Sequence, residues 1–311
     1  MCRLQLIAVL LLIVIVPCSV FAQNNDDDKK IIAPSQIYSP LGAKPQSSDK
    51  DLAIQYYASG DYAKAAVLYE KLYNEEPNTY YYRYLYYSLL GLGEYDKAID
   101  LAKKAKRKDA RNKVQYQIDE AYVHIISGNA SKGYKVFDNA IKSVQPKQLE
   151  ITLLASSFVR LHENKYAIKT CLKGRELLND KKLYCVELSD CYFKEKEYKK
   201  SVKELVDVAM YNPKMINLVY TKLERYMDND ADGMATSAIR EELMLLTREF
   251  PNSSIYSDLM LWFSLQDGDF DLAFLQVKAN DKRNDEEGFN VLEFALVCCQ
   301  NGAYKIAQDA Y

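Results

Sequence analysis

A repeat of about three dozen residues is the feature of this sequence that most limits how it can fold. Four segments share a glycine, any residue, an aromatic residue, two further residues and an alanine. They begin at Gly60, Gly93, Gly268 and Gly302. The first two glycines are 33 residues apart and the last two are 34 apart. A fixed period of this size indicates stacked copies of one unit, because a single unit cannot bury its own apolar face.

The intervening sequence keeps the period and reads as helices separated by short breaks. Eight units begin near residues 46, 79, 114, 148, 182, 216, 254 and 288, with an expanded turn at Asp228 to Gly233 in the sixth. Small residues such as Ala53 let two helix backbones approach, and large residues such as Tyr69 fill the space beside them. Gly60 supplies the turn between the two helices and Pro77 ends the second. Each unit is therefore predicted to be a pair of antiparallel helices.

This pattern resembles the tetratricopeptide repeat (TPR) family. The first unit reads Leu52-Ala53-x2-Tyr56, Ala65-x3-Tyr69, Leu72, Pro77; the fifth reads Leu188-Ser189-x2-Tyr192, Ser201-x3-Leu205, Val208, Pro213; the eighth reads Phe294-Ala295-x2-Cys298, Ala307-x3-Tyr311. The resemblance implies an all-α, right-handed superhelical solenoid of about eight repeats over residues 48–311. The last repeat is expected to be truncated, because Tyr311 falls within its second helix. Altered helix packing is expected where Tyr86 replaces a small residue, where Gly133 replaces alanine, and where the fourth and sixth units lack the glycine-x-aromatic turn.

In TPR folds the first helix of each unit lines a concave groove, so the resemblance also implies a binding surface. It places Lys50, Tyr57, Tyr80, Arg83, Tyr87, Tyr122, Arg160, Asp190 and Trp262 there. Tyrosine and arginine are favoured at interfaces because they give a large contact area with a polar tip. The alternative is that most of these tyrosines pack between repeats. The cationic clamp that some TPR domains use for C-terminal carboxylates is not reproduced, since Ile54 and Tyr87 stand where asparagine is expected.

The N-terminus has the pattern of a secretory signal over residues 1–22. Arg3 precedes an uncharged run from Leu4 to Val16, and Val20-Phe21-Ala22 precedes a cleavage point at Gln23. The run is shorter than a membrane-spanning helix needs. An uncleaved anchor, or a lipid anchor at Cys18, is the alternative. Residues 23–47, with three prolines, are predicted to be a disordered linker. We expect export to the periplasm or cell envelope of a Gram-negative bacterium, with no membrane span after cleavage.

No motif for catalysis, a cofactor or a metal was found. His124 is expected to be a packing residue and His162 a surface residue, and neither has ligands at metal spacing. Cys171, Cys185, Cys191, Cys298 and Cys299 have no regular spacing, so they are expected to be small buried residues, with one oxidised pair as the alternative. The formal net charge of -2 gives no basic stripe for nucleic acid.

The predicted function is a non-enzymatic scaffold that binds a protein or peptide in the groove. Two alternatives belong to other classes. One is a sensory or accessory region of a longer signalling protein or enzyme. The other is a surface lipoprotein that captures glycans or nutrients, since tyrosine and tryptophan rings stack on sugars.

Overall fold

The computed structural model describes residues 48–311. The predicted signal sequence, Cys18 and the predicted linker lie outside the described residues. Within the described part, every regular element is a helix. The structure therefore confirms the predicted all-α class and its helix pairs.

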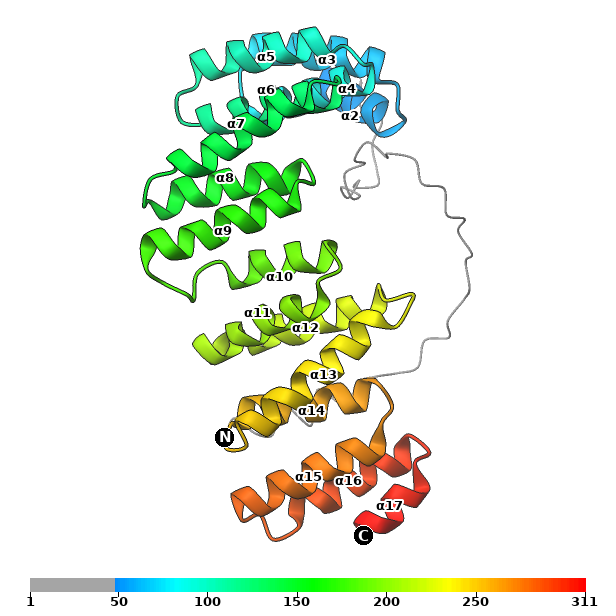
Figure 1. Ribbon diagram of the computed structural model, residues 1–311. Coiled ribbons are helices and arrows are strands. Elements are labelled where there is room, and N and C mark those ends of the chain that lie inside the picture. Colours follow the sequence, from blue (N-terminus) through cyan, green and yellow to red (C-terminus); the bar gives the residue numbers. More distant parts are fainter. Residues whose placement is uncertain (1–47) are drawn as a thin grey trace.

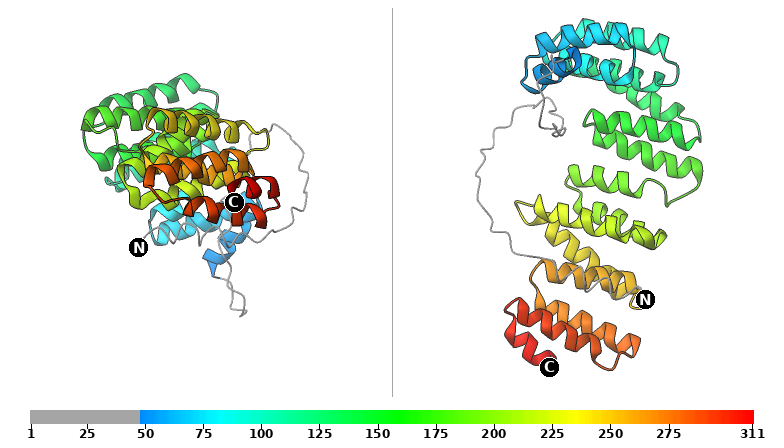
Figure 2. Two further views of the ribbon diagram at one scale, coloured as in Figure 1. Left: turned by 90° about the horizontal axis from the view of Figure 1, so that it is seen from below. Right: turned by 180° about the vertical axis from the view of Figure 1, so that it is seen from behind.

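Each repeat contains a first helix, called helix A, and a second, called helix B. The A helices are α2 (Asp49–Ala58), α4 (Thr79–Gly91), α6 (Lys113–Ile126), α8 (Gln148–Arg160), α10 (Cys185–Lys194), α12 (Ile216–Asp228), α14 (Ser254–Gln266) and α16 (Phe289–Gln300). The B helices are α3 (Tyr62–Glu75), α5 (Tyr95–Lys108), α7 (Ala130–Ser143), α9 (Asn164–Leu178), α11 (Tyr198–Tyr211), α13 (Met234–Glu249), α15 (Phe270–Asn284) and α17 (Tyr304–Ala310). A short 3₁₀ helix, η1 (Pro213–Met215), precedes α12. The pairs follow one another in chain order along an elongated, curved solenoid (Figures 1 and 2).

The turns between helices A and B depend on one residue in the left-handed backbone conformation. Gly60 and Gly93 occupy it with φ of 78° and 70°, a region in which glycine has no steric penalty. The fourth and fifth units use His162 and Lys196 there, both with φ of 59°. The turn thus persists where the glycine is missing, and His162 is exposed as predicted.

Close helix packing explains the small residues of the repeat. Ala53, Ala65 and Ala98 are fully buried between helices. At Gly133 a Cβ atom would lie 2.4 Å from the backbone oxygen of Ala121. Helices α6 and α7 therefore approach more closely than alanine would allow, which is the altered packing expected in the third unit.

The buried side chains form three successive clusters along the described part of the chain. The first extends from Ala53 to Tyr192, the second from Cys185 to Phe263, and the third from Ala273 to Ala307. Each unit thus packs mainly on its neighbours, as in other solenoids.

Five cysteines lie in the described part of the chain, and all five are free thiols. Cys171, Cys185, Cys191 and Cys298 are buried, whereas Cys299 is exposed. The prediction of small buried residues is therefore confirmed for four of the five and is wrong for Cys299. Among residues 48–311, no helix combines the length and the apolar character that crossing a bilayer requires.

Candidate functional site

The structure distributes the nine predicted groove residues over four places, each on A helices. The first is the N-terminal end of the solenoid. The second, the Asp119 cluster, comprises Asp119, Arg160, Tyr82, Tyr86 and Tyr87. The third, the Asp190 cluster, comprises Asp190, Lys222, Arg225 and Tyr226. The fourth is the ring pair of Tyr220 and Trp262.

At the N-terminal end, α2 and α4 present cations beside tyrosine rings. The Lys50 ammonium lies 5.9 Å from the centre of the Tyr80 ring, within the range of a cation–π contact. The Arg83 side chain is exposed, and no carboxylate of the described residues forms an ion pair with it. Tyr57 differs from these residues because it is 95% buried, with an exposed fraction of 5%. Its ring packs against Tyr84 at 5.0 Å, so Tyr57 belongs to the packing between repeats.

The Asp119 cluster joins the A helices of units two, three and four. The Asp119 carboxylate is fully buried; it forms an ion pair with Arg160 and accepts a 3.0 Å hydrogen bond from the Tyr82 hydroxyl. The Tyr86 hydroxyl donates to the Asp119 backbone oxygen at 2.9 Å. Arg160 Nη1 donates to the Tyr87 hydroxyl at 3.2 Å. Two predicted groove residues, Tyr87 and Arg160, are thus held in place by a buried network.

Burial dominates the electrostatics of this cluster. It raises the pKa of Asp119, although Arg160 and Tyr82 act in the opposite direction by stabilising the carboxylate. It also raises the pKa values of Tyr82 and Tyr86 well above their usual value, with Asp119 adding to the shift. Both phenols therefore remain protonated donors at neutral pH.

Tyr122 lies on α6 near this cluster and is half-buried. Burial raises the pKa of its phenol, and the nearby Glu163 and Tyr87 contribute to the shift. Tyr122 therefore presents a neutral hydroxyl beside Tyr87.

The Asp190 cluster joins α10 to α12. Lys222 Nζ contacts both carboxylate oxygens of Asp190, at 2.6 and 2.8 Å. The Tyr226 hydroxyl donates to Asp190 at 3.1 Å, and Arg225 forms a further ion pair at 3.2 Å. The Tyr226 ring stacks on Phe193 at 4.0 Å, and burial raises the pKa of Tyr226 to about 12. Asp190 is consequently a structural anchor whose charge is already compensated.

The ring pair joins α12 to α14. The centres of the Tyr220 and Trp262 rings are 5.0 Å apart. Trp262 is half-buried. The buried Tyr220 hydroxyl has no hydrogen-bond partner within residues 48–311. The partly exposed Trp262 indole, packed on this ring, offers an apolar surface.

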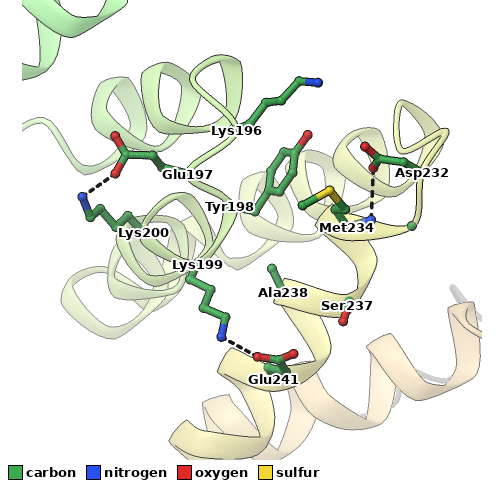
Figure 3. A pocket seen from close by; sticks show the side chains of 11 residues that line it. Lys196, Glu197, Tyr198, Lys199, Lys200, Asp232, Met234, Ser237, Ala238 and Glu241 are labelled. Carbon is green, nitrogen blue, oxygen red and sulfur yellow. Dashed lines mark hydrogen bonds and ion pairs between the residues drawn. The ribbon is translucent and has the colours of Figure 1, made fainter.

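A pocket of about 630 Å³ lies away from the nine residues, between the α10–α11 turn and the expanded α12–α13 turn (Figure 3). Tyr198 and Met234 face one another across it. Lys199 pairs with Glu241 and Lys200 pairs with Glu197, while the Asp232 carboxylate accepts a hydrogen bond from the backbone N–H of Met234. The acidic side chains that line this pocket are thus already engaged in ion pairs or hydrogen bonds.

The sequence did not reveal the residues that hold the predicted groove residues in place, above all Asp119, Lys222 and Tyr220. One signal did point to Asp119. A tyrosine at position 86, where the repeat expects a small residue, is buried with its hydroxyl and needs a polar partner. In the described part of the chain, no group of three acidic, histidine or cysteine side chains is arranged to hold a metal ion.

The paired helices, left-handed turns and closely packed alanines define a TPR-like solenoid. No protein-family model matches the sequence, and no curated protein matches it. Among solved structures, the C-terminal part of a TPR repeat-containing protein from Cytophaga hutchinsonii is similar with 19% identity and a TM-score of 0.30, covering 76% of this chain and 96% of that one. A tetratricopeptide repeat protein from Parabacteroides merdae is similar with 13% identity and a TM-score of 0.30, covering 84% of this chain and 97% of that one. The class assignment rests on this chain's own repeats and helix pairs.

Proposed function

We propose that this chain is a non-enzymatic scaffold that binds a segment of a partner protein on the partly exposed side chains of its A helices. Solenoids of this kind present extended surfaces that suit such binding. The observation that carries the proposal is a set of aromatic and cationic side chains already held in position. Tyr87 is held by Arg160, Trp262 packs on Tyr220, and Tyr80 packs on Tyr84 with the ring centres 4.7 Å apart. Side chains that are ordered before binding lose less entropy when a partner docks.

The proposed partner is an extended or helical protein segment rather than nucleic acid. On the A helices at the N-terminal end of the described chain, the exposed cations beside the tyrosines are Lys50 and Arg83. Lys64 and Lys71 on α3 are also exposed, but each forms an ion pair, with Asp61 and Asp49 respectively. Phosphate backbones require many such contacts. Cationic and aromatic side chains in small numbers suit a protein segment that carries an acidic and an apolar residue.

The proposed setting is the envelope of a Gram-negative bacterium, based on the signal-like pattern of residues 1–22. Mass spectrometry of the mature N-terminus tests this setting. A chain that begins at Gln23 in the periplasmic fraction is the expected result. A full-length chain in the cytoplasmic fraction would refute the proposed export.

Crosslinking in the native envelope, followed by mass spectrometry, tests the binding surface. Tyr87→Ala and Trp262→Ala are expected to reduce the yield of a specific crosslinked partner about tenfold together. Tyr304→Ala is the matched control, because Tyr304 is 70% exposed but lies on the last B helix. Tyr87→Phe separates the loss of contact area from the loss of the hydrogen bond to Arg160. An unchanged set of crosslinked partners in the double variant would rule out this surface.

A further inference from the structure

Exposed apolar side chains gather where two neighbouring B helices end. Met210 and Tyr211 close α11, and Phe250 follows α13; they are 37%, 42% and 50% exposed. The Ser253 hydroxyl contacts the Met210 sulfur at 3.9 Å, and the Phe250 ring lies 5.6 Å from the Tyr256 ring. Helices α11 and α13 pack against each other, and both end on the side of the solenoid away from the A–B turns (Figure 1). We call this surface the α11–α13 edge.

Carboxylates surround these apolar side chains. Asp207 lies one helical turn before Tyr211, while Glu242 and Glu249 lie on α13. Within the described chain none of the three forms an ion pair or a hydrogen bond. Burial and the neighbouring Glu204 raise the pKa of Asp207, and burial with Glu249 and Asp207 raises that of Glu242. Lys203 offsets part of both shifts.

The carboxylates and the apolar side chains form one continuous surface. Tyr256 connects them, because Asp207, Tyr211 and Glu249 all lie close enough to raise the pKa of its phenol. Its ring also contacts Phe250. Negative charge and apolar area are therefore offered together to whatever docks at this edge.

The helix ends add negative potential to the α11–α13 edge. An α-helix carries roughly half a negative charge at its C-terminus, and both α11 and α13 end here. The last turn of α11 contains no basic residue, and that of α13 contains Arg248. On the rim, the Lys182 ammonium lies 5.3 Å from the centre of the Tyr211 ring. The Tyr211 ring is thus already in contact with one cation of this chain.

We propose that the α11–α13 edge docks a cationic amphipathic helix of a partner protein. Its apolar face would cover Met210, Tyr211 and Phe250, and its lysine or arginine side chains would lie beside Asp207, Glu242 and Glu249. Methionine adapts to irregular apolar surfaces, which suits such a docking site. An anionic membrane does not fit, because it would repel the same three carboxylates. This surface is separate from the A-helix residues of the proposed function.

Fluorescence anisotropy with the full chain tests the proposal. The probe is a helical peptide of about 18 residues, or five turns, with leucines on one face and lysines on the other; the comparison peptide has glutamates in place of the lysines. The lysine peptide is expected to bind at least about tenfold more tightly, with an affinity that falls as salt is raised. Glu242→Lys with Glu249→Lys, and separately Phe250→Ser, are each expected to weaken binding about tenfold.

Glu70→Lys with Glu75→Lys is the matched control, because it makes the same charge change at exposed positions of α3. An equal loss of affinity in this control would show that only net charge matters and would overturn the proposal. Two other results would also overturn the proposal. One is that Phe250→Ser binds the lysine peptide as tightly as the unaltered chain; the other is that the α11–α13 edge binds anionic vesicles more tightly than the lysine peptide. Tyr87→Ala is expected to bind the lysine peptide like the unaltered chain, which separates this test from that of the proposed function.

Discussion

Removing Arg160 tests whether the Asp119 cluster is what fixes the A helices of units two to four. In Arg160→Met the guanidinium is lost but most of the apolar stem remains. The Asp119 side chain has an exposed fraction of 0%, and that of Arg160 is 14% exposed. Losing one partner of such a pair leaves an uncompensated buried charge, which costs about 3–5 kcal/mol of folding free energy. The hydrogen bond from Tyr82 remains and favours the lower end of that range.

The folding free energy lost in Arg160→Met is expected to increase as pH rises. Burial already raises the pKa of Asp119 above its unfolded value, and Arg160 opposes that shift. Without Arg160 the folded-state pKa rises further. When the pKa of a carboxyl group is higher in the folded than in the unfolded chain, protonation of that group favours the folded state. Its contribution to the free energy of unfolding is fully present below the unfolded pKa of about 3.9, and it is lost as pH rises through the folded pKa. The deficit of Arg160→Met should therefore be smaller at about pH 4.5 than at about pH 8.

Urea unfolding, followed by circular dichroism and by fluorescence, shows which units Arg160→Met destabilises. Circular dichroism reports all helices, whereas fluorescence reports Trp262, the single tryptophan of the sequence, in unit seven. Because solenoid stability is a sum over neighbouring units, the circular dichroism transition should shift more than the fluorescence transition. Replacing both partners, as Asp119→Leu with Arg160→Met, should cost less than the two single losses added together. A single variant within about 0.5 kcal/mol of the unaltered chain at pH 8 would refute the reasoning.

Three further predictions concern other parts of the chain. Gly133→Ala should lower the thermal midpoint, at a cost of about 1–3 kcal/mol, because its Cβ would meet the Ala121 backbone oxygen; an unchanged midpoint would contradict the close approach of α6 and α7. Tyr226→Phe should cost about 1 kcal/mol by leaving Asp190 and Ser189 without its hydroxyl, measured by urea unfolding. Cys299 should be the fastest of the five described thiols to react with iodoacetamide in the folded chain, since the other four are buried; peptide mapping that finds Cys171 modified first would contradict the structure.

Much of the fold follows from the sequence because it depends on local, periodic signals. The spacing of Gly60 and Gly93 and the small residues at Ala53 and Ala65 are readable along the chain, and they determine where helices turn and approach. The fourth-unit turn was harder to foresee. His162 adopts the left-handed conformation that the repeat usually assigns to glycine, and a single sequence gives no sign of a residue that tolerates this strain.

The candidate site was less predictable, because it depends on side-chain partners from different units. Projecting the repeat located Arg160 and Tyr87 on A helices. It did not show that Arg160 contacts both Tyr87 and the buried carboxylate of Asp119, 41 residues earlier in the chain. It also assigned Tyr57 to the groove, although that ring is buried against Tyr84 of the next unit. A repeat pattern specifies the helix face approximately, whereas burial depends on packing between units.

The Asp119 cluster also links binding to stability. Tyr87, on the proposed binding surface, shares Arg160 with the buried carboxylate of Asp119. A partner that holds Tyr87 in its native position therefore stabilises the arrangement of α4, α6 and α8. For a ligand at a hundred times its dissociation constant, the gain is about 2.7 kcal/mol. In Arg160→Met, Tyr87 no longer shares a partner with Asp119, so the same ligand should restore little of the stability that this variant loses. A partner that bound elsewhere on the solenoid would stabilise its own units and leave α4, α6 and α8 as weak as before, because coupling in a solenoid passes mainly between neighbours.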